Sequence, residues 1–258
     1  MREQELKDFL DEKADHYNHP DFIHDDPIQI PHRFTVRQDV EITGFLAATI
    51  AWGNRKSIIK SAENILNIMG NNPYDFVLNH TESDLKNIGD RALHRTFHSA
   101  DFVHFMKRMK VVYQQYPSLE DLFLMLPNET NFYHALERFR TQFLGEESHR
   151  SHKHISSTYK NSAAKRLMMY LRWMVRTDQR GVDFGIWTRL NPAHLSIPLD
   201  VHTGNIARKL GILTRKQNDW KTVEALDQTI RKWDAQDPAK YDFALFGLGV
   251  SGDLDEIE

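Results

Sequence analysis

The stretch "IPLDVHTGNIARKLG" (residues 197–211) carries the signals of one complete short helix. Asp200 follows a proline-containing turn and stands where a helix N-cap is expected, with Val201 as the first helical residue. Two basic residues fill the expected last turn, and Gly211 follows as the terminating residue. The cap alone explains an acid at position 200, because such a cap stabilises a helix by about 0.5–2 kcal/mol. Whether Asp200 also carries chemistry depends on the rest of the chain.

Apolar residues recur with helical spacing along almost the whole sequence, and the 9 prolines and most of the 12 glycines stand between the periodic runs. The segments "TESD" (81–84) and "SLED" (118–121) have the pattern of capping boxes. No run of alternating β-branched residues competes with the helices, so the fold class is expected to be all-α. We expect helices over 38–51, 56–69, 100–115, 118–126, 131–143, 162–176, 201–210, 222–233 and 239–248.

The composition is that of an ordinary globular protein, with 258 residues, 40% hydrophobic and 27% charged. The absence of cysteine excludes disulfides, thiolate zinc sites, iron–sulfur clusters and cysteine nucleophiles. The first 20 residues lack the apolar core of a signal peptide, and no later apolar run approaches the roughly 18 residues of a membrane span. We expect a soluble cytoplasmic protein that does not enter membranes.

Charge is distributed unevenly along the chain. The net charge is −3, yet residues 149–180 contain eight Lys or Arg and one acid, which gives that segment +7 and leaves −10 for the remainder. Such asymmetry indicates a local surface for an anionic partner. The alternative is a solvated basic helix whose charges are matched by neighbouring acids in space.

The helix expected at 162–176 places one lysine apart from its apolar stripe. Ala163, Leu167, Leu171 and Met174 share one face, whereas Lys165 falls on another, together with Met169, Arg172 and Arg176. With a cap at Asn161 or Ser162, Lys165 lies in the first turn, where the helix dipole disfavours a protonated amine. Nucleophilic catalysis needs a neutral amine, although a surface lysine on a basic helix is the commoner explanation of such a residue.

Three segments taken together resemble a known family. They are "FLAATIAWGNRKSIIKSAENILNIMG" (45–70), "SAAKRLMMYLRWMVR" (162–176) and the 197–211 stretch, and "YDFALFGLG" (241–249) closes the match. The chain resembles a family of uncharacterised bacterial proteins found especially in Bacteroidetes. That family distantly resembles the helix-hairpin-helix DNA glycosylases, with the 8-oxoguanine glycosylase/lyases, including the archaeal type, as the nearest branches.

The resemblance implies a helix-hairpin-helix glycosylase-like fold within one all-α unit, 1–258. Two helical subdomains are implied, with a cleft between them. One subdomain is a helical bundle over 40–148. The other combines 1–39 with 149–258 and contains the hairpin-like segment and the catalytic residues.

The resemblance also implies the site residues. The "PxDVH" stretch of 8-oxoguanine glycosylases carries the catalytic aspartate, which here is Asp200, and "SAAK" places the Schiff-base lysine at Lys165. The usual glycine-rich hairpin is replaced by "STYKNSAA", which has no glycine. The implied DNA-binding residues are Gly53, Asn54 and Arg55 in a loop that probes the DNA, Lys160, Asn161 and Ser162 in the hairpin, Arg166, and His202 on a phosphate.

The implied activity is that of a base-excision repair N-glycosylase and abasic-site lyase acting on a damaged base, with an oxidised purine as one candidate. The partner is duplex DNA, so the protein would associate with the nucleoid, and no cofactor or obligate protein partner is expected. A nucleic-acid-binding protein on the same fold without catalysis is the first alternative, because the hairpin has lost its glycines.

The second alternative is a helical hydrolase that uses histidines and a metal. The segments considered are "HRSHKH" (149–154), "HRTFH" (94–98) and "HDD" (24–26). The first is surrounded by cations, the second lacks the glutamate of a zinc-protease helix, and the third needs further ligands that the sequence does not supply. We therefore predict no metal site.

Overall fold

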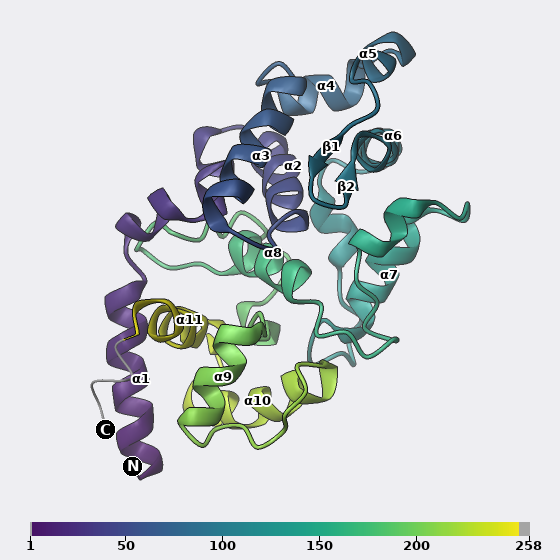
Figure 1. Ribbon diagram of the computed structural model, residues 1–258. Helices are drawn as coiled ribbons and strands as arrows, with labels where there is room; N and C mark the ends of the chain where they lie inside the picture. The colour runs from purple at the N-terminus through teal and green to yellow at the C-terminus, as the bar shows by residue number, and fades with distance from the viewer. Residues whose placement is uncertain (1, 253–258) are drawn as a thin grey trace. The chain divides into compact units, whose positions relative to one another are not determined.

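The computed structural model describes residues 2–252 as a mostly helical protein with one two-stranded antiparallel hairpin (Figure 1). The expectation of a helical chain is confirmed, and the hairpin is an addition to it. The hairpin consists of β1 (Ala92–His94) and β2 (Phe97–His98). The α-helices are α1 (Glu3–Tyr17), α2 (Arg37–Thr49), α3 (Arg55–Ile68), α4 (Pro73–Asn79), α5 (Glu82–Asn87), α6 (Ser99–Gln115), α7 (Tyr133–Leu144), α8 (Lys165–Val175), α9 (Val201–Lys209), α10 (Trp220–Trp233) and α11 (Tyr241–Ser251).

Short 3₁₀ helices connect these elements. They are η1 (Pro20–Asp25), η2 (Pro27–Gln29), η3 (Pro31–Arg33), η4 (Leu119–Phe123), η5 (Arg150–His154), η6 (Pro192–His194) and η7 (Pro238–Lys240). The chain forms two compact units. The first contains the residues up to Phe22, Pro127–His134 and the chain from Ser157 onward, and the second contains Ile23–Leu126 and Ala135–Ser156. The expected single unit 1–258 includes residues 1 and 253–258, which lie outside the described part.

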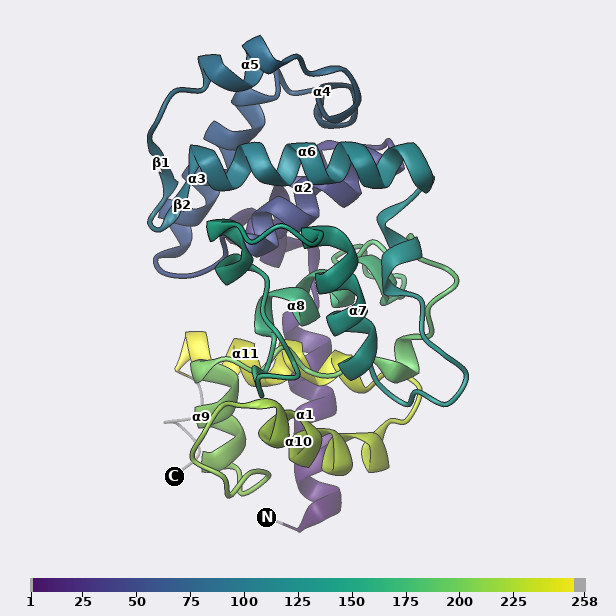
Figure 2. The same ribbon diagram turned by 90° about the vertical axis from the view of Figure 1, so that its right-hand side faces the viewer.

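The second unit is built around α2, which is buried along almost its whole length (Figure 2). Phe45 in this helix packs against Phe105, Phe139 and Phe143, with ring centroids 5.0–5.7 Å apart. Such aromatic contacts supply large apolar areas in defined edge and stacked geometries. The core of this unit is therefore an aromatic cluster contributed by α2, α6 and α7.

Buried Glu41 of α2 explains why the segment that starts at Ser118 forms η4 and not the expected α-helix over 118–126. Its carboxylate accepts hydrogen bonds from the Tyr113 hydroxyl at 2.9 Å, the Ser118 hydroxyl at 2.5 Å and the Leu119 amide at 3.0 Å. These bonds hold the start of the segment against α2, and the Ser118 hydroxyl oxygen accepts from the Glu120 amide at 3.0 Å and caps η4. The other expected capping box, at Thr81, is confirmed at the start of α5.

The first unit packs α11 against both α1 and α9, as Figure 1 shows. Two glycines of α11 allow these close contacts. A Cβ atom at Gly247 would lie 2.2 Å from the Tyr17 ring of α1, and one at Gly249 would lie 3.0 Å from Cβ of His202 in α9. Because α9 begins at the residue after Asp200, the glycines of α11 help to fix the position of this carboxylate.

Replacing Gly247 with alanine is expected to destabilise the protein by about 1–3 kcal/mol, because the added methyl group overlaps the Tyr17 ring. Helix propensity alone would favour the alanine by about 1 kcal/mol, so the sign of the change reports the packing. Thermal unfolding measures the effect: Gly247→Ala is compared with the wild-type protein, and Tyr17→Ala/Gly247→Ala is compared with Tyr17→Ala. In the Tyr17→Ala background the same alanine should stabilise. Destabilisation of equal size in both backgrounds would contradict this explanation.

No helix in the described residues 2–252 is both long and apolar enough to span a membrane.

Candidate functional site

The loop before α8, where the resemblance would place a glycine-rich hairpin, has ordinary residues in unusual conformations. Asn161 and Ala164 both adopt positive φ angles, +62° and +47°, in the left-handed region that usually favours glycine. A tight turn forms because the Asn161 amide donates to the Thr158 carbonyl at 2.8 Å and the Ser162 amide donates to the Ser157 carbonyl at 3.2 Å. The loop thus has two residues in the left-handed backbone conformation, and neither of them is glycine.

The expected helix start at 162 is wrong, because α8 begins at Lys165. The Ser162 hydroxyl accepts from the Ala164 amide at 3.1 Å, which stabilises a turn and not the first turn of the helix. Ala164 is the N-cap, and no side chain caps the helix. Lys165 is consequently the first residue of α8, so its side chain leaves the helix at the end where unpaired backbone N–H groups lie.

Lys165 and Asp200 lie side by side, as the sequence analysis predicts. Lys165 Nζ is 3.9 Å from Asp200 Oδ2. Their side chains are 28% and 19% exposed, respectively, so solvent reaches both. The two residues are 35 positions apart in the sequence, at the start of α8 and at the N-cap of α9, so their contact is not a consequence of local chain geometry.

The two oxygens of the Asp200 carboxylate have different partners. Oδ1 accepts a hydrogen bond from the Thr203 amide at 2.9 Å and caps α9, whereas Oδ2 faces Lys165. The Asp200 carbonyl oxygen accepts from Asn218 Nδ2 at 2.9 Å. The cap fixes the carboxyl group and leaves one oxygen directed at the amine, so helix capping and a role beside Lys165 are compatible.

A second carboxylate, that of Asp242 in α11, interacts electrostatically with this pair. It is buried and receives a hydrogen bond from Arg172 Nη1. Burial raises the pKa of Asp242 to about 6; Arg172 opposes this shift, and the negative charge of Asp200 adds to it. The pair therefore stands next to a buried charge cluster and not over a purely apolar core.

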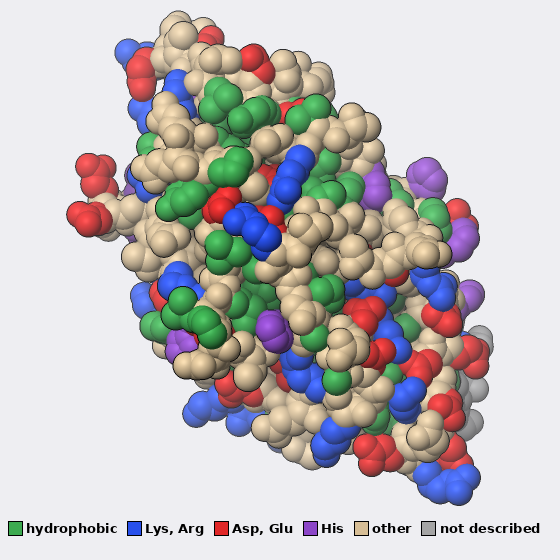
Figure 3. Space-filling view, turned by 180° about the vertical axis from the view of Figure 1, so that it is seen from behind, with side chains coloured by type: hydrophobic (Ala, Val, Ile, Leu, Met, Phe, Trp, Pro, Cys, Tyr) green, Lys and Arg blue, Asp and Glu red, His purple; other side chains and the backbone are tan. Residues whose placement is uncertain are grey.

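The basic segment 149–180 does not form the continuous cationic surface that its +7 charge predicts, because several of its cations are buried or paired; its binding to DNA stays a prediction. Arg172 and Arg176 are buried. Arg172 pairs with Asp183 at 3.2 Å, and Arg176 pairs with Asp237 at 2.8 Å. Arg176 also pairs with Asp183 at 3.2 Å. Positive and negative side chains are interspersed on the face shown in Figure 3.

Further cations of the segment are also matched by acids, as the alternative explanation of its charge requires. Arg180 pairs with Asp15 at 2.5 Å, and Arg150 pairs with Asp101 at 3.3 Å. Arg166 is largely enclosed, and burial lowers the pKa of its guanidinium to about 10. Asp15 and Asp101 come from elements distant in sequence, whereas Asp183 lies close to the segment.

The hairpin residues expected to bind DNA have mixed surroundings. Lys160 is exposed, whereas Asn161 Nδ2 donates to Asp219 at 3.1 Å and the Ser162 hydroxyl is used by Ala164. The Asn161 carbonyl also accepts from the Trp220 amide at 3.1 Å, so the loop is joined to the start of α10. These contacts give the Asn161 and Ser162 side chains structural roles and leave Lys160 accessible.

His202 is exposed in the first turn of α9, two residues after Asp200. The other expected DNA-binding loop lies in the second unit, where Gly53 has a φ of +101° and the Asn54 side chain accepts from the Ser57 amide at 3.2 Å to cap α3. Arg55 is the first residue of α3. The DNA contacts of these residues stay predictions.

The histidine-rich segments serve the protein's own structure. His149 and His104 stack with ring centroids 4.2 Å apart, and His154 lies 3.3 Å from Asp101. His94 and His98 lie on the hairpin and not on a helix. Within residues 2–252 no group of three or more His, Asp or Glu side chains is arranged to hold a metal ion.

A family model described as a protein of unknown function (DUF2400) matches residues 26–251. The chain belongs to this family. Comparison with curated proteins and with solved structures finds no match. The family assignment confirms the resemblance to a family of uncharacterised proteins. The link of that family to DNA glycosylases stays a prediction.

The sequence pattern does not predict the hairpin β1–β2 or the polar pocket beside it in the second unit. The pocket has a volume of about 450 Å³. Neither Lys165 nor Asp200 is among the residues that line it. The signal in the sequence is the pair Arg91 and Arg95, which flanks the short segment "ALH".

Proposed function

We propose that this protein is a DNA base-excision N-glycosylase and abasic-site lyase with a helix-hairpin-helix glycosylase-like fold. The observation that carries the proposal is the 3.9 Å distance between Lys165 Nζ and Asp200 Oδ2 at the solvent-accessible start of two helices. The Asp200 cap uses Oδ1 and leaves Oδ2 directed at an accessible lysine amine, which is the arrangement that the proposed reaction needs.

In the proposed reaction Asp200 stabilises the positive charge that develops on the deoxyribose as the glycosidic bond breaks. The damaged base departs with the bonding electron pair and takes up a proton. The neutral amine of Lys165 forms a bond to C1′, the ring oxygen O4′ is released as a hydroxyl group, and a Schiff base results. Loss of a C2′ proton then expels the 3′ phosphate and nicks the strand.

The base must leave the duplex before it can reach these groups, as in other enzymes that act on a base. The uncapped N-terminus of α8 and exposed Lys160 support the proposal, because backbone N–H groups and a nearby cation favour a phosphate. The chemistry requires no metal or organic cofactor. An oxidised purine is the first substrate to test, since the resemblance is to 8-oxoguanine enzymes.

The proposal predicts that sodium borohydride traps the protein covalently on a duplex that contains the correct damaged base. Duplexes that carry 8-oxoguanine, other oxidised or alkylated bases, uracil or a natural abasic site are incubated with the protein and reductant and separated by denaturing electrophoresis. An adduct that needs both DNA and borohydride supports the Schiff base. A folded protein that binds DNA but yields no adduct, even with an abasic site, contradicts the lyase and favours a binding protein without catalysis.

A further inference from the structure

The hairpin of the second unit is fixed to the loop at the start of α3 by a buried histidine. His94 Nε2 lies 3.0 Å from the Trp52 carbonyl oxygen, and Nδ1 lies 3.0 Å from the Ser61 hydroxyl. The Trp52 ring also meets the His94 ring edge-on at 5.1 Å. Strand β1 and the first half of α3 therefore form one rigid part of the surface.

Arg95, at the hairpin tip, lies directly against Gly53. A Cβ atom at Gly53 would be 2.3 Å from Arg95 Nη1, so the guanidinium reaches the loop backbone only because position 53 is glycine. Arg95 is exposed and has a positive φ of +51°. A non-glycine residue in this conformation costs about 1–3 kcal/mol, and such strain is concentrated at functional sites.

Helix α3 presents a polar stripe next to this arginine. Lys56, Lys60, Asn64 and Asn67 are exposed and follow the spacing i, i+4, i+8 and i+11, which places them on one helix face. The acid that also falls on this face, Glu63, pairs with Arg33 at 2.6 Å.

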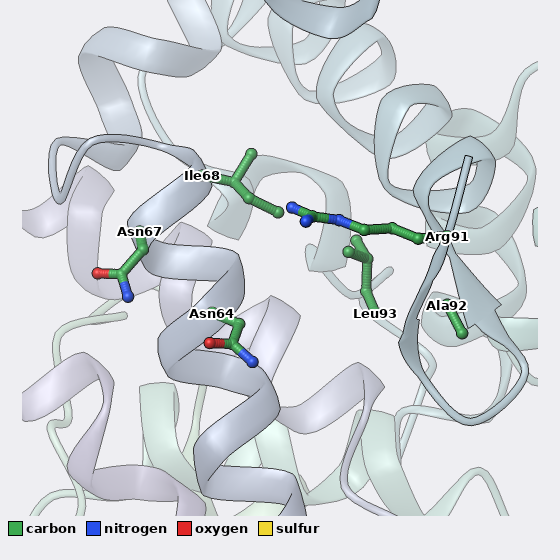
Figure 4. Close-up of a pocket in the computed structure, with 6 residues that line it drawn as sticks. All are labelled: Asn64, Asn67, Ile68, Arg91, Ala92 and Leu93. Atoms are coloured by element: carbon green, nitrogen blue, oxygen red, sulfur yellow. The ribbon is translucent and has the colours of Figure 1, made fainter. Parts of the chain in front are cut away.

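The pocket of about 450 Å³ continues the stripe toward β1. Figure 4 shows Asn64 and Asn67 on one side and Arg91 on the other, with the Arg91 guanidinium extending toward Ile68 of α3. Amide groups and a guanidinium thus line the same hollow, and both are common partners of phosphate and sugar oxygens.

We propose that this surface binds the phosphate backbone of duplex DNA. We call it the α3–hairpin face, defined as Lys56, Lys60, Asn64, Asn67, Arg91 and Arg95. Its four cations have no acidic partner among the described residues, in contrast to the paired cations of segment 149–180. The inference rests on the proposed function for its choice of DNA as the partner.

The position of the face agrees with this role. Arg95 contacts Gly53, and Lys56 follows Arg55, so the cations flank the loop that the sequence analysis predicts to enter the space left by a flipped base. An enzyme that extrudes a base must hold the backbone on either side of it. The face would supply such contacts without reading the base sequence.

The test is the salt dependence of DNA binding by Arg91→Gln/Arg95→Asn. Asparagine tolerates the positive φ at position 95, so the variant removes two charges without new strain. The probe is a fluorescent duplex with a tetrahydrofuran abasic analogue, which cannot form a Schiff base. Loss of two phosphate contacts should reduce the slope of log K against log salt by about 2 in magnitude and weaken binding similarly for unrelated sequences.

A matched control removes two cations from another helix of the same unit. Lys107→Ala/Lys110→Ala, on α6, should keep the slope of the wild-type protein; Lys107 pairs with Glu82 at 2.8 Å and Lys110 donates to the His80 carbonyl at 3.3 Å. Melting temperatures confirm that both variants fold. An unchanged slope for Arg91→Gln/Arg95→Asn, or an equal reduction in the control, overturns the inference.

The outcome separates this inference from the proposed function. Wild-type protein that is trapped by borohydride, combined with an unchanged slope in Arg91→Gln/Arg95→Asn, refutes the α3–hairpin face and leaves the lyase intact. A reduced slope without any trapping supports the face and refutes the lyase.

Discussion

Lys165→Gln should lose borohydride trapping and strand nicking completely while it retains DNA binding. Glutamine has no nucleophilic amine, so no Schiff base can form. The side chain is 28% exposed and keeps a polar end beside Asp200, so the fold should tolerate the change. Denaturing electrophoresis after borohydride treatment measures the adduct, and fluorescence anisotropy with the abasic analogue measures binding.

The matched control is Lys221→Gln, an exposed lysine on α10 of the same unit. This variant should be trapped as efficiently as the wild-type protein. An adduct that persists in folded Lys165→Gln would assign the nucleophile to another amine and would remove the reason for placing Lys165 in the site.

The sequence predicts α9 well because all of its signals are local. Asp200 caps the helix, and Gly211 follows it with a φ of +75°, as the pattern of residues 197–211 indicates. The pairing of Lys165 with Asp200 was also predictable, but only from a resemblance, since no periodicity relates residues 35 positions apart.

The start of α8 could not be predicted from the same kind of signal. Ser162 has the residue type of a cap, yet its hydroxyl closes a turn and its backbone pairs with Asp219. This tertiary contact joins the loop to α10 and delays the helix until Lys165. Local propensity is a weak guide where a distant segment supplies the hydrogen bonds.

The buried arginines show a similar limit. Periodicity placed Arg172 and Arg176 away from the apolar stripe, but Asp183, Asp237 and Asp242 approach them from other segments and make their burial possible. Buried charges are tolerated when they are paired in this way. Net charge along a segment therefore did not predict the charge at the surface, whereas the smaller set on α3 and the hairpin is exposed.

Asp200→Asn should fold with a stability within about 1 kcal/mol of the wild-type protein and lose base excision by about 10²–10³-fold. The asparagine oxygen can still accept from the Thr203 amide, as Asp200 Oδ1 does at 2.9 Å, so the cap remains. The negative charge that faces Lys165 at 3.9 Å is lost, and with it the stabilisation of positive charge on the sugar. Single-turnover excision and thermal unfolding measure the two effects separately.

Asp200→Ala distinguishes the two roles of the carboxylate, because it removes the cap as well as the charge. If Asp200 is both cap and electrostatic stabiliser, the alanine variant loses about 0.5–2 kcal/mol of stability and as much activity as Asp200→Asn. If Asp200 is only a cap, Asp200→Asn keeps full excision activity, and Asp200→Ala loses activity only in proportion to the unfolded fraction. Full activity in folded Asp200→Asn would therefore limit this residue to the helix end, even though its second oxygen faces the lysine.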